Sequence, residues 1–266
     1  MAANTPFDCV LLDLDDTLYP GNTGIGPALK RNIDEFLQAK LGVSAERAAA
    51  MRVDLFRTHG SSLAGLIALG YDVHPDEYHS YVHGRLPYDR IAADPQLARL
   101  LQSIPQRKVL FTNSDRAHMK RALERLGVDE AVFDAVVCFE TMNPHLFGEA
   151  RPSGEEARVV VLKPSVDAIV AGLRVAGSNP RRTLFLDDSE RNIAAGKALG
   201  LRTALVRNQP TNNFARSIGT MESNAVTAGR PHRPSPDGNG ARYRPAGWLH
   251  DAKMPRGARS DGYASS

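Results

Sequence analysis

Apolar and polar positions follow two different patterns along this chain. Short continuous apolar runs, which are typical of strands buried on both faces of a parallel sheet, occur at residues 9–14, 108–112, 135–139, 183–186 and 202–206. The segments between the later runs carry apolar residues at helical spacing. Strand and helix units that alternate at this length predict an α/β fold with a parallel, doubly wound, Rossmann-like sheet.

Helical spacing is clearest in the second half of the chain. Two sets of apolar residues each share one predicted helix face: Met119, Ala122, Leu123 and Leu126 in 115–126, and Val166, Ile169, Val170 and Leu173 in 165–176. Ser114 is the expected N-cap of the first helix, and Gly127 is its expected stop. Gly177 is expected to end the second helix.

Residues 20–98 show helical periodicity throughout. Apolar residues mark the expected helices: Ile33, Phe36, Leu37 and Leu41, then Ala48, Met51, Leu55 and Phe56, then the shorter pieces 63–69 and 75–83. Asp94 and Pro95 form an expected N-cap and N1 pair. An all-helical block inserted after the first strand predicts a cap over the strand ends, which excludes water and selects substrates. The expected domains are a core of 7–19 and 99–206 and a helical cap of 20–98.

Residues 207–266 differ in composition from the rest. They are rich in Gly, Pro, Ser, Asn and Arg and have almost no apolar periodicity, so we expect a disordered tail. The tail carries nine Lys or Arg against four Asp or Glu, which accounts for the net charge of +3 and leaves the remainder near −2. Because the basic balance lies in the tail, it does not predict a nucleic-acid-binding face.

Bulk features favour an intracellular protein. Cys9 and Cys138 lie in apolar runs without a disulfide framework, which favours a reducing compartment. No signal peptide precedes the first strand, and no apolar stretch approaches the ~18 residues of a membrane span. We therefore expect a cytoplasmic location and no membrane or nucleic-acid partner; the sequence leaves the oligomeric state open.

Four polar clusters follow strand ends in a fixed order. They are Asp13 and Asp15 after the first strand, Thr112, Asn113 and Ser114 after the second, Lys163 before a helix, and Asp187 and Asp188 after a later strand. In open α/β sheets, ligands bind at the carboxyl ends of the strands. Each cluster alone could be a helix cap or a surface charge, but the four together predict one active site.

The residue types in these clusters fit phosphoryl transfer. A carboxylate of Asp13 or Asp15 can attack phosphorus, and the other can protonate the leaving oxygen and then activate water. Asp187 and Asp188 would complete the hard oxygen ligands that Mg²⁺ prefers. Thr112, with the amides of Asn113 and Ser114, can hold phosphate oxygens near a helix N-terminus, and Lys163 can offset their charge.

The histidines outside the four clusters are weaker candidates for functional residues. His79 and His83 are four residues apart on an expected helix, which is a possible zinc pair. The sequence shows no third ligand nearby, and we expect a solvated helix face instead. His118 is a single histidine with no predicted role.

The four clusters resemble the motifs of the haloacid dehalogenase (HAD)-like hydrolase superfamily over about residues 7–206. The resemblance implies a Rossmann-like core with a helical cap, Mg²⁺ as cofactor, and hydrolysis through an aspartyl-phosphate. It makes Asp13 the nucleophile and a metal ligand, and Asp15 the acid/base that also binds the metal through its backbone carbonyl. Asp188 should be a metal ligand, and Asp187 should either bind the metal or support its ligands.

Segments 14–19, 58–66 and 185–192 are similar to the pyrimidine 5′-nucleotidase branch, which includes fungal nucleotidases and plant relatives. The implied substrates are pyrimidine nucleoside monophosphates, and Gly60, Ser61 and Ser62 are the expected specificity residues. A simple turn between helices is the alternative for these three.

Three other functions stay open. The first is a phosphatase of sugar phosphates or other small metabolites. The second, a haloacid dehalogenase, is disfavoured because dehalogenases need no metal and keep no acid at the position of Asp15. The third is a non-catalytic variant that acts as an interaction or regulatory protein. It is suggested by the tail, which replaces the further short strand and closing helix usual in the family and resembles a splice or frame-shift product.

Overall fold

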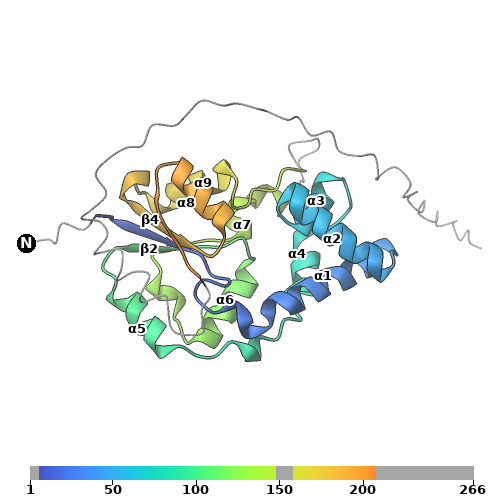
Figure 1. Ribbon diagram of the computed structural model, residues 1–266, viewed down its shortest axis with the longest axis horizontal. Coiled ribbons are helices and arrows are strands. Elements are labelled where there is room, and N and C mark those ends of the chain that lie inside the picture. Colours follow the sequence, from blue (N-terminus) through green and yellow to red (C-terminus); the bar gives the residue numbers. More distant parts are fainter. Residues whose placement is uncertain (1–5, 148–157, 208–266) are drawn as a thin grey trace, which may run out of the picture. The chain divides into compact units, whose positions relative to one another are not determined.

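The architecture is that of a five-stranded parallel sheet covered by helices on both faces (Figure 1). We describe it from a computed structural model, which defines residues 6–147 and 158–207. The strands are β1 (Cys9–Leu12), β2 (Arg107–Phe111), β3 (Ala135–Val137), β4 (Thr183–Asp187) and β5 (Arg202–Leu205). Their spatial order is β3-β2-β1-β4-β5, and every adjacent pair is parallel. The doubly wound α/β fold class predicted from the sequence is confirmed.

The register of the three central strands brings the polar clusters to one edge. Leu12 is aligned with Leu110 on one side and with Leu186 on the other. The amide of Asp13 donates to the carbonyl of Leu186 at 3.0 Å, so the chain is still paired where the first carboxylate begins. Consequently, the residues that follow β1, β2 and β4 leave the sheet side by side.

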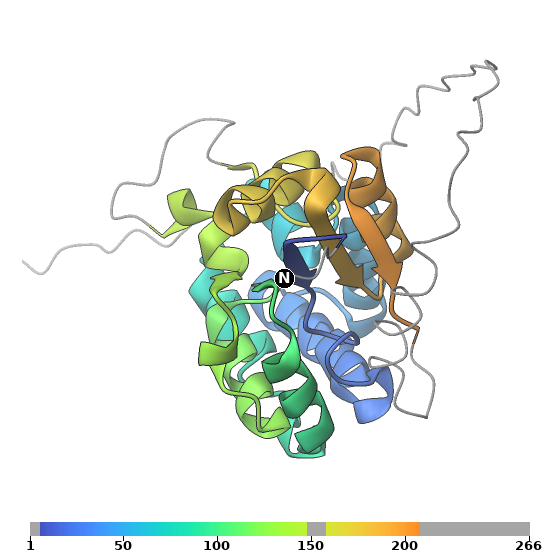
Figure 2. The same ribbon diagram turned by 90° about the vertical axis from the view of Figure 1, so that its left-hand side faces the viewer.

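Helices cover both faces of the sheet (Figures 1 and 2). The core helices are α5 (Pro95–Ser103), α6 (Arg116–Leu126), the short α7 (Phe139–Met142), α8 (Val166–Ala176) and α9 (Glu190–Ala198). α8 and α9 lie against one face, and α5 and α6 lie against the other. Alternate residues of β1 separate accordingly: Leu11 packs with the α8 side, and Leu12 packs with the α5 and α6 side.

Two details of these helices differ from the prediction. Asp115, not Ser114, is the N-cap of α6, and its carboxylate accepts from the amide of His118. In α8, Val166 and Val170 are exposed, while Ile169 lies in the core together with small residues. The packed face includes Gly172, where a Cβ would lie 3.2 Å from the Phe111 ring, so the helix approaches β2 through its glycine and not through the valines.

Four helices between β1 and α5 form the inserted cap: α1 (Ile25–Leu41), α2 (Ala45–His59), α3 (Ser62–Ala68) and α4 (Pro75–Val82). Two single-turn 3₁₀ helices flank them, η1 (Gly21–Thr23) and η2 (Tyr88–Arg90). Phe56, expected on the buried face of α2, is exposed. The expected boundary at 98 and 99 falls within α5, whose N-cap is Asp94 as predicted. The division into core and cap domains itself stays a prediction.

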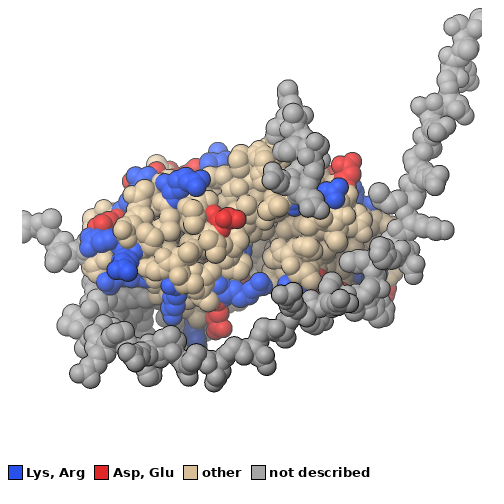
Figure 3. Space-filling model, turned by 90° about the horizontal axis from the view of Figure 1, so that it is seen from above, with Lys and Arg blue, Asp and Glu red and all other residues tan. Residues whose placement is uncertain are grey.

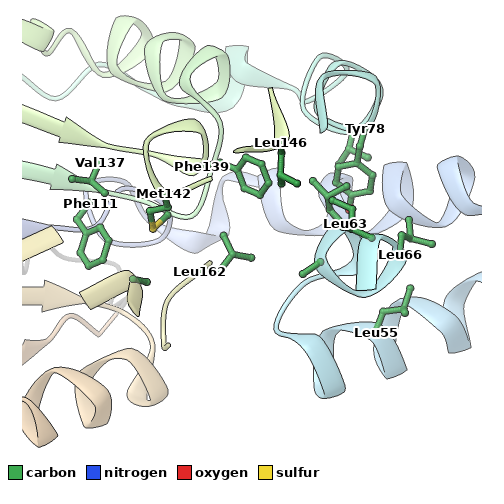
Figure 4. Close-up of a cluster of buried hydrophobic side chains, with 14 of the residues drawn as sticks. Leu55, Leu63, Leu66, Tyr78, Phe111, Val137, Phe139, Met142, Leu146 and Leu162 are labelled. Carbon is green, nitrogen blue, oxygen red and sulfur yellow. The ribbon is translucent and has the colours of Figure 1, made fainter. Parts of the chain in front are cut away.

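Apolar side chains connect cap and core without a break (Figure 4). In the close-up, Phe139 and Leu146 lie between Met142 and Leu162 on the sheet side and Tyr78 and Leu63 on the cap side. All of them belong to one buried cluster that also contains Phe111 and Val137. The cap is therefore seated on the core partly through the residues that follow β3.

The remaining bulk predictions are tested only in part. The predicted tail lies outside the described residues beyond Arg207. In the part of the chain that the structure describes, no helix is both long and apolar enough to cross a membrane. Basic and acidic residues are interspersed over the uncovered part of the face seen in Figure 3, with no continuous basic patch there.

Candidate active site

Lys163 is the central cation of the site. Its Nζ donates to Asp13 Oδ1 at 2.7 Å, to Asp187 Oδ2 at 2.8 Å and to the Phe111 carbonyl at 2.6 Å. These three bonds use every proton of the ammonium group. The residue is 3% exposed; burial by itself lowers the pKa of Lys163, but the two carboxylates raise it above its ordinary value. Lys163 is therefore a buried charge that joins β1, β2 and β4.

Asn113 fixes the segment that carries this lysine. Its side-chain amide donates to the Lys163 carbonyl at 3.0 Å, and its Oδ1 accepts from the Lys163 amide at 2.8 Å. The side chain of Asn113 therefore holds Lys163 in place. The prediction for Asn113 concerned its backbone amide, as a phosphate donor. Its own amide nitrogen is a separate group and remains a candidate phosphate donor.

Asp13 lies directly after β1 and is almost fully buried. Its Oδ2 accepts from the Thr17 hydroxyl at 2.8 Å, while Oδ1 faces Lys163. Burial is the largest influence on this carboxyl and raises its pKa to about 7; Lys163 opposes the rise and Asp187 adds to it. The carboxylate is held in one orientation by partners on both oxygens.

Asp187 and Asp188 are adjacent but differ in environment. Asp187 is fully buried and accepts from Asn192 Nδ2 at 2.9 and 3.0 Å and from the Ser189 amide at 2.9 Å, in addition to Lys163. Asp188 is exposed, and its side chain accepts a hydrogen bond from its own backbone amide. Burial, then Asp187 and Asp16, raise the pKa of Asp188 to about 6.

Carboxylate oxygens of Asp13, Asp187 and Asp188 lie within 4.8 Å of one another. Such a set of hard oxygen donors fits Mg²⁺, which binds one or two carboxylates and completes its shell with water or phosphate. Asp188 suits the ligand role best because its side chain is exposed and its negative charge is poorly neutralised. Asp187, whose oxygens are already bonded, is better suited to holding Lys163.

In metal-free protein, the raised pKa values of Asp13 and Asp188 should make stability depend on pH. The folded state binds these protons more tightly than the unfolded chain, whose carboxyl pKa lies near ~4. The free energy of unfolding should therefore be highest near the acidic end of this window and fall as pH rises from about 4 to about 7. In EDTA we expect a melting temperature at pH 8 that is lower than at pH 6, by roughly 3 °C or more.

Millimolar Mg²⁺ at pH 8 should raise the melting temperature again, because a cation at these oxygens replaces the missing protons. Asp188→Asn is the matched control, and it should reduce both the pH slope and the Mg²⁺ effect. A melting temperature that changes with neither pH nor Mg²⁺ would contradict this electrostatic account.

Asp15 is bonded to three side chains from different segments. Its carboxylate accepts from the Tyr19 hydroxyl, from Ser114 Oγ at 2.7 Å and, through Oδ1, from His118 Nε2 at 2.6 Å. Burial raises its pKa, but His118 and then the other two donors outweigh that effect, so the pKa of Asp15 lies well below its usual range. Asp15 is therefore an ionised group in this arrangement.

Thr112 and Ser114, which belong with Asn113 to the cluster after β2, make different contacts. Thr112 is buried, and its Oγ1 accepts from the Ser114 amide at 3.0 Å, which fixes the turn after β2. The amide of Ser114, predicted to bind phosphate, donates to Thr112 in the structure, and the Ser114 hydroxyl donates to Asp15. The predicted catalytic, phosphate-binding and metal residues thus lie together at one edge of the sheet. Their individual roles stay predictions.

Other residues at the site were not predicted. They are Thr17 and Tyr19 after β1, Tyr88 in η2, His118 in α6 and Asn192 in α9. The first two lie four residues after the carboxylates that they contact, and His118 lies one turn into the helix after the second cluster. Their position beside the motifs is a signal in the sequence, but their contacts depend on tertiary packing.

His79 and His83 are not on a solvated helix face, contrary to expectation. His79 is 7% exposed and packs edge-to-face on Phe139 with centroids 4.7 Å apart. Asp115 lies near both histidines and is hydrogen-bonded to His83 Nδ1. Because that direct bond and the nearly parallel stacking of the two imidazoles account for the contacts, we assign no metal to this group.

Gly60, Ser61 and Ser62 connect α2 to α3. Gly60 has a φ of +83° and ends α2, while the Ser61 hydroxyl accepts from the Ala64 amide at 3.0 Å and caps α3. Ser62 is buried and hydrogen-bonds Tyr78. These contacts explain the three residues as a turn between helices, and a role in specificity stays a prediction.

Comparison with known proteins identifies the family and the fold of this chain. The haloacid dehalogenase-like hydrolase family profile matches residues 7–200, well over half of the chain. Phosphate metabolism protein 8 of Saccharomyces cerevisiae is 26% identical over 199 residues, which are 71% of this chain and 58% of that protein. The chain thus matches less than two thirds of this relative's length. CbbY from Rhodobacter sphaeroides, solved in complex with phosphate, matches at 20% identity with a TM-score of 0.50, over 79% of this chain and 91% of CbbY.

The chain belongs to the haloacid dehalogenase-like hydrolases, as the resemblance of its four motifs implied. The acidic cluster at the edge of the sheet is its candidate metal site. The similarity to CbbY shows the fold alone.

Proposed function

We propose that this protein is a Mg²⁺-dependent phosphomonoesterase that works through an aspartyl-phosphate on Asp13. The observation that carries the proposal is the fixed Asp13 carboxylate, with Lys163 on one oxygen and Thr17 on the other, beside an acidic cluster and a second carboxylate. A lysine that neutralises the nucleophile reduces its repulsion of a phosphate dianion.

The residues support a two-step reaction. In the first step a carboxylate oxygen of Asp13 forms a bond to phosphorus as the ester oxygen departs and takes a proton from Asp15. A phosphate dianion beside Asp15 favours the protonated form that this step requires. In the second step, Asp15 accepts a proton from water, which attacks phosphorus and releases Asp13 and inorganic phosphate.

The metal-binding residues would be Asp13, Asp188 and the backbone carbonyl of Asp15, with Asp187 as support. Mg²⁺, when bound, would neutralise the phosphoryl oxygens and draw the dianion toward the carboxylates. An acid at position 15 and a poorly neutralised Asp188 also favour phosphate ester hydrolysis over dehalogenation. A dehalogenase needs neither group.

The proposed substrates are pyrimidine nucleoside 5′-monophosphates. This choice rests on the similarity of segments 14–19, 58–66 and 185–192 to pyrimidine 5′-nucleotidases. The name of the yeast relative, phosphate metabolism protein 8, fits a phosphatase without specifying a substrate. Sugar phosphates are the second candidate class, because a cap that covers the strand ends suits any small phosphorylated metabolite.

Phosphate release with Mg²⁺ should be fastest from UMP or CMP in a panel that also contains AMP, GMP and several sugar phosphates. We expect kcat/KM for UMP or CMP to exceed that for the purine nucleotides by about tenfold or more, since one favourable contact contributes roughly 1.4 kcal/mol. Faster release from sugar phosphates would keep the phosphatase and reject the nucleotide assignment. A folded protein that releases phosphate from none of them would favour the non-catalytic variant.

A further inference from the structure

His118 connects the proposed acid/base to the cap. Its ring is 2% exposed; Nε2 lies 2.6 Å from Asp15 Oδ1, and Nδ1 lies 2.8 Å from the Tyr88 hydroxyl. Tyr88 belongs to η2, in the segment between α4 and α5, whereas His118 belongs to α6 of the core. A single imidazole thus has one nitrogen on the proposed acid/base and the other on a residue of the expected cap, 20–98.

The partner of Nε2 determines which ring nitrogen donates. An ionised carboxylate can only accept hydrogen bonds, so Nε2 must carry a proton in its contact with Asp15. Tyr88 can either donate to Nδ1 or accept from it, and its hydroxyl is also 3.2 Å from the His83 carbonyl. In both cases, Tyr88 fixes the plane of the ring and thereby the direction of the Nε2 proton.

The surroundings leave this ring little freedom to rotate. The His83 ring lies 4.8 Å from it between centroids, and His83 is itself hydrogen-bonded to Asp115, the N-cap of α6. Arg125, which lies about two turns beyond His118 on the same side of α6, donates to the Tyr88 carbonyl at 3.1 Å. The contacts form a continuous path from the end of α4, through Tyr88 and His118, to Asp15.

We propose that His118 is a positioning residue for Asp15, and that Tyr88 makes this positioning depend on the seating of the cap. Ser114 and Tyr19 hold Asp15 from the core side and from its own loop, and His118 provides the third donor. The proposal rests on the phosphatase function proposed above. It adds that the acid/base is aligned only while the segment carrying Tyr88 is packed against α6.

Leaving-group dependence tests the proposal, because a positioned acid matters only for a poor leaving group. The measured quantity is kcat/KM with UMP, which releases a basic alkoxide, and with p-nitrophenyl phosphate, which needs little protonation. If the wild-type protein does not hydrolyse UMP, β-glycerophosphate replaces it as the alkyl ester. The variants are His118→Leu, which keeps the volume without a donor, and His118→Gln, whose side-chain amide can still donate near the position of Nε2.

We expect His118→Leu to lower kcat/KM for the alkyl phosphate by about 10²-fold and that for p-nitrophenyl phosphate by less than about threefold. His118→Gln should recover most of the loss, and Tyr88→Phe should show the same selectivity with a smaller loss of roughly three- to tenfold. Equal losses on both substrates, or a Gln variant no better than Leu, would overturn the proposal.

His79→Leu and His79→Gln are the matched controls. His79 is also a buried histidine next to His83, but no described residue forms a hydrogen bond with its ring, and it does not contact Asp15. Its variants should affect both substrates equally. If the His79 variants reproduced the selectivity of the His118 variants, the effect would belong to general packing and the proposal would fail.

A wild-type protein that hydrolyses neither ester would reject the proposed function, and the positioning contact can then be tested without turnover. In ¹⁵N-histidine spectra, Asp15→Asn should shift the Nε2 resonance of His118, and Tyr88→Phe should shift its Nδ1 resonance. Unchanged His118 resonances in both variants would overturn the proposed contact independently of any activity.

Discussion

Asp13→Asn should abolish turnover and leave the protein folded. An amide cannot attack phosphorus, so kcat should fall by about 10⁴-fold or more, as for loss of other covalent nucleophiles. The fold should persist because the amide oxygen can still accept from Lys163 and the amide nitrogen can donate to Thr17, which occupy the two sides of the carboxylate. Removing a buried carboxylate whose pKa is raised also removes a source of strain at pH 8.

The measurement is phosphate release under saturating substrate, together with a thermal melt at pH 8. The expected melting temperature equals or exceeds that of the wild type. Asp134→Asn, at an exposed carboxylate that accepts from the Lys108 amide, is a control for the substitution itself. A variant that retains substantial kcat would exclude Asp13 as the nucleophile.

Lys163→Met should have the largest effect on stability. The lysine is the buried cation between Asp13 and Asp187, and its loss would leave two buried carboxylates facing each other. Breaking a buried pair by removing one partner costs about 3–5 kcal/mol. Denaturant unfolding at pH 8 should show this loss, whereas Lys120→Met on the exposed side of α6 should change stability by less than about 0.5 kcal/mol.

The double variant Lys163→Met/Asp187→Asn separates charge from packing. Neutralising Asp187 removes one of the two unpaired carboxylates, so much of the lost stability should return. Activity should not return, because Asp13 still lacks its cation. If the double variant were less stable than Lys163→Met, the loss would come from packing around the lysine stem and not from buried charge.

The sheet and the location of the site were predictable from local patterns. Five apolar runs gave five strands, and parallel strands necessarily bring Asp13, Thr112 and Asp187 to the same edge. Helix ends were predictable where the local chemistry is decisive, as at Asp94 before Pro95 and at Gly127 and Gly177. Ser114 and Asp115 are both suitable N-cap residues for α6, so the sequence alone did not decide between them. Asp115 is the N-cap of α6, and the Ser114 hydroxyl donates to Asp15 instead.

What could not be predicted depends on contacts between distant segments. Periodicity in α8 predicted a buried face of Val166, Ile169, Val170 and Leu173. Ile169 is buried as predicted, but the two valines are exposed, and Gly172 permits a close approach of the helix to Phe111. Similarly, His79 and His83 look like a solvated pair until α4 is seen to pack against Phe139 and Asp115. His118 appeared as an isolated histidine because its partners lie 30 and 103 positions away along the chain.

The covalent intermediate on Asp13 is the most direct test of the proposed chemistry. The wild type should be mixed with Mg²⁺ and ³²P-labelled substrate, quenched in acid within one turnover, and digested for mass spectrometry. We expect a hydroxylamine-labile phosphate on the peptide that contains Asp13, and no label on the Asp13→Asn protein. Rapid turnover without any trapped label on Asp13, or a label on another residue, would contradict the aspartyl-phosphate mechanism.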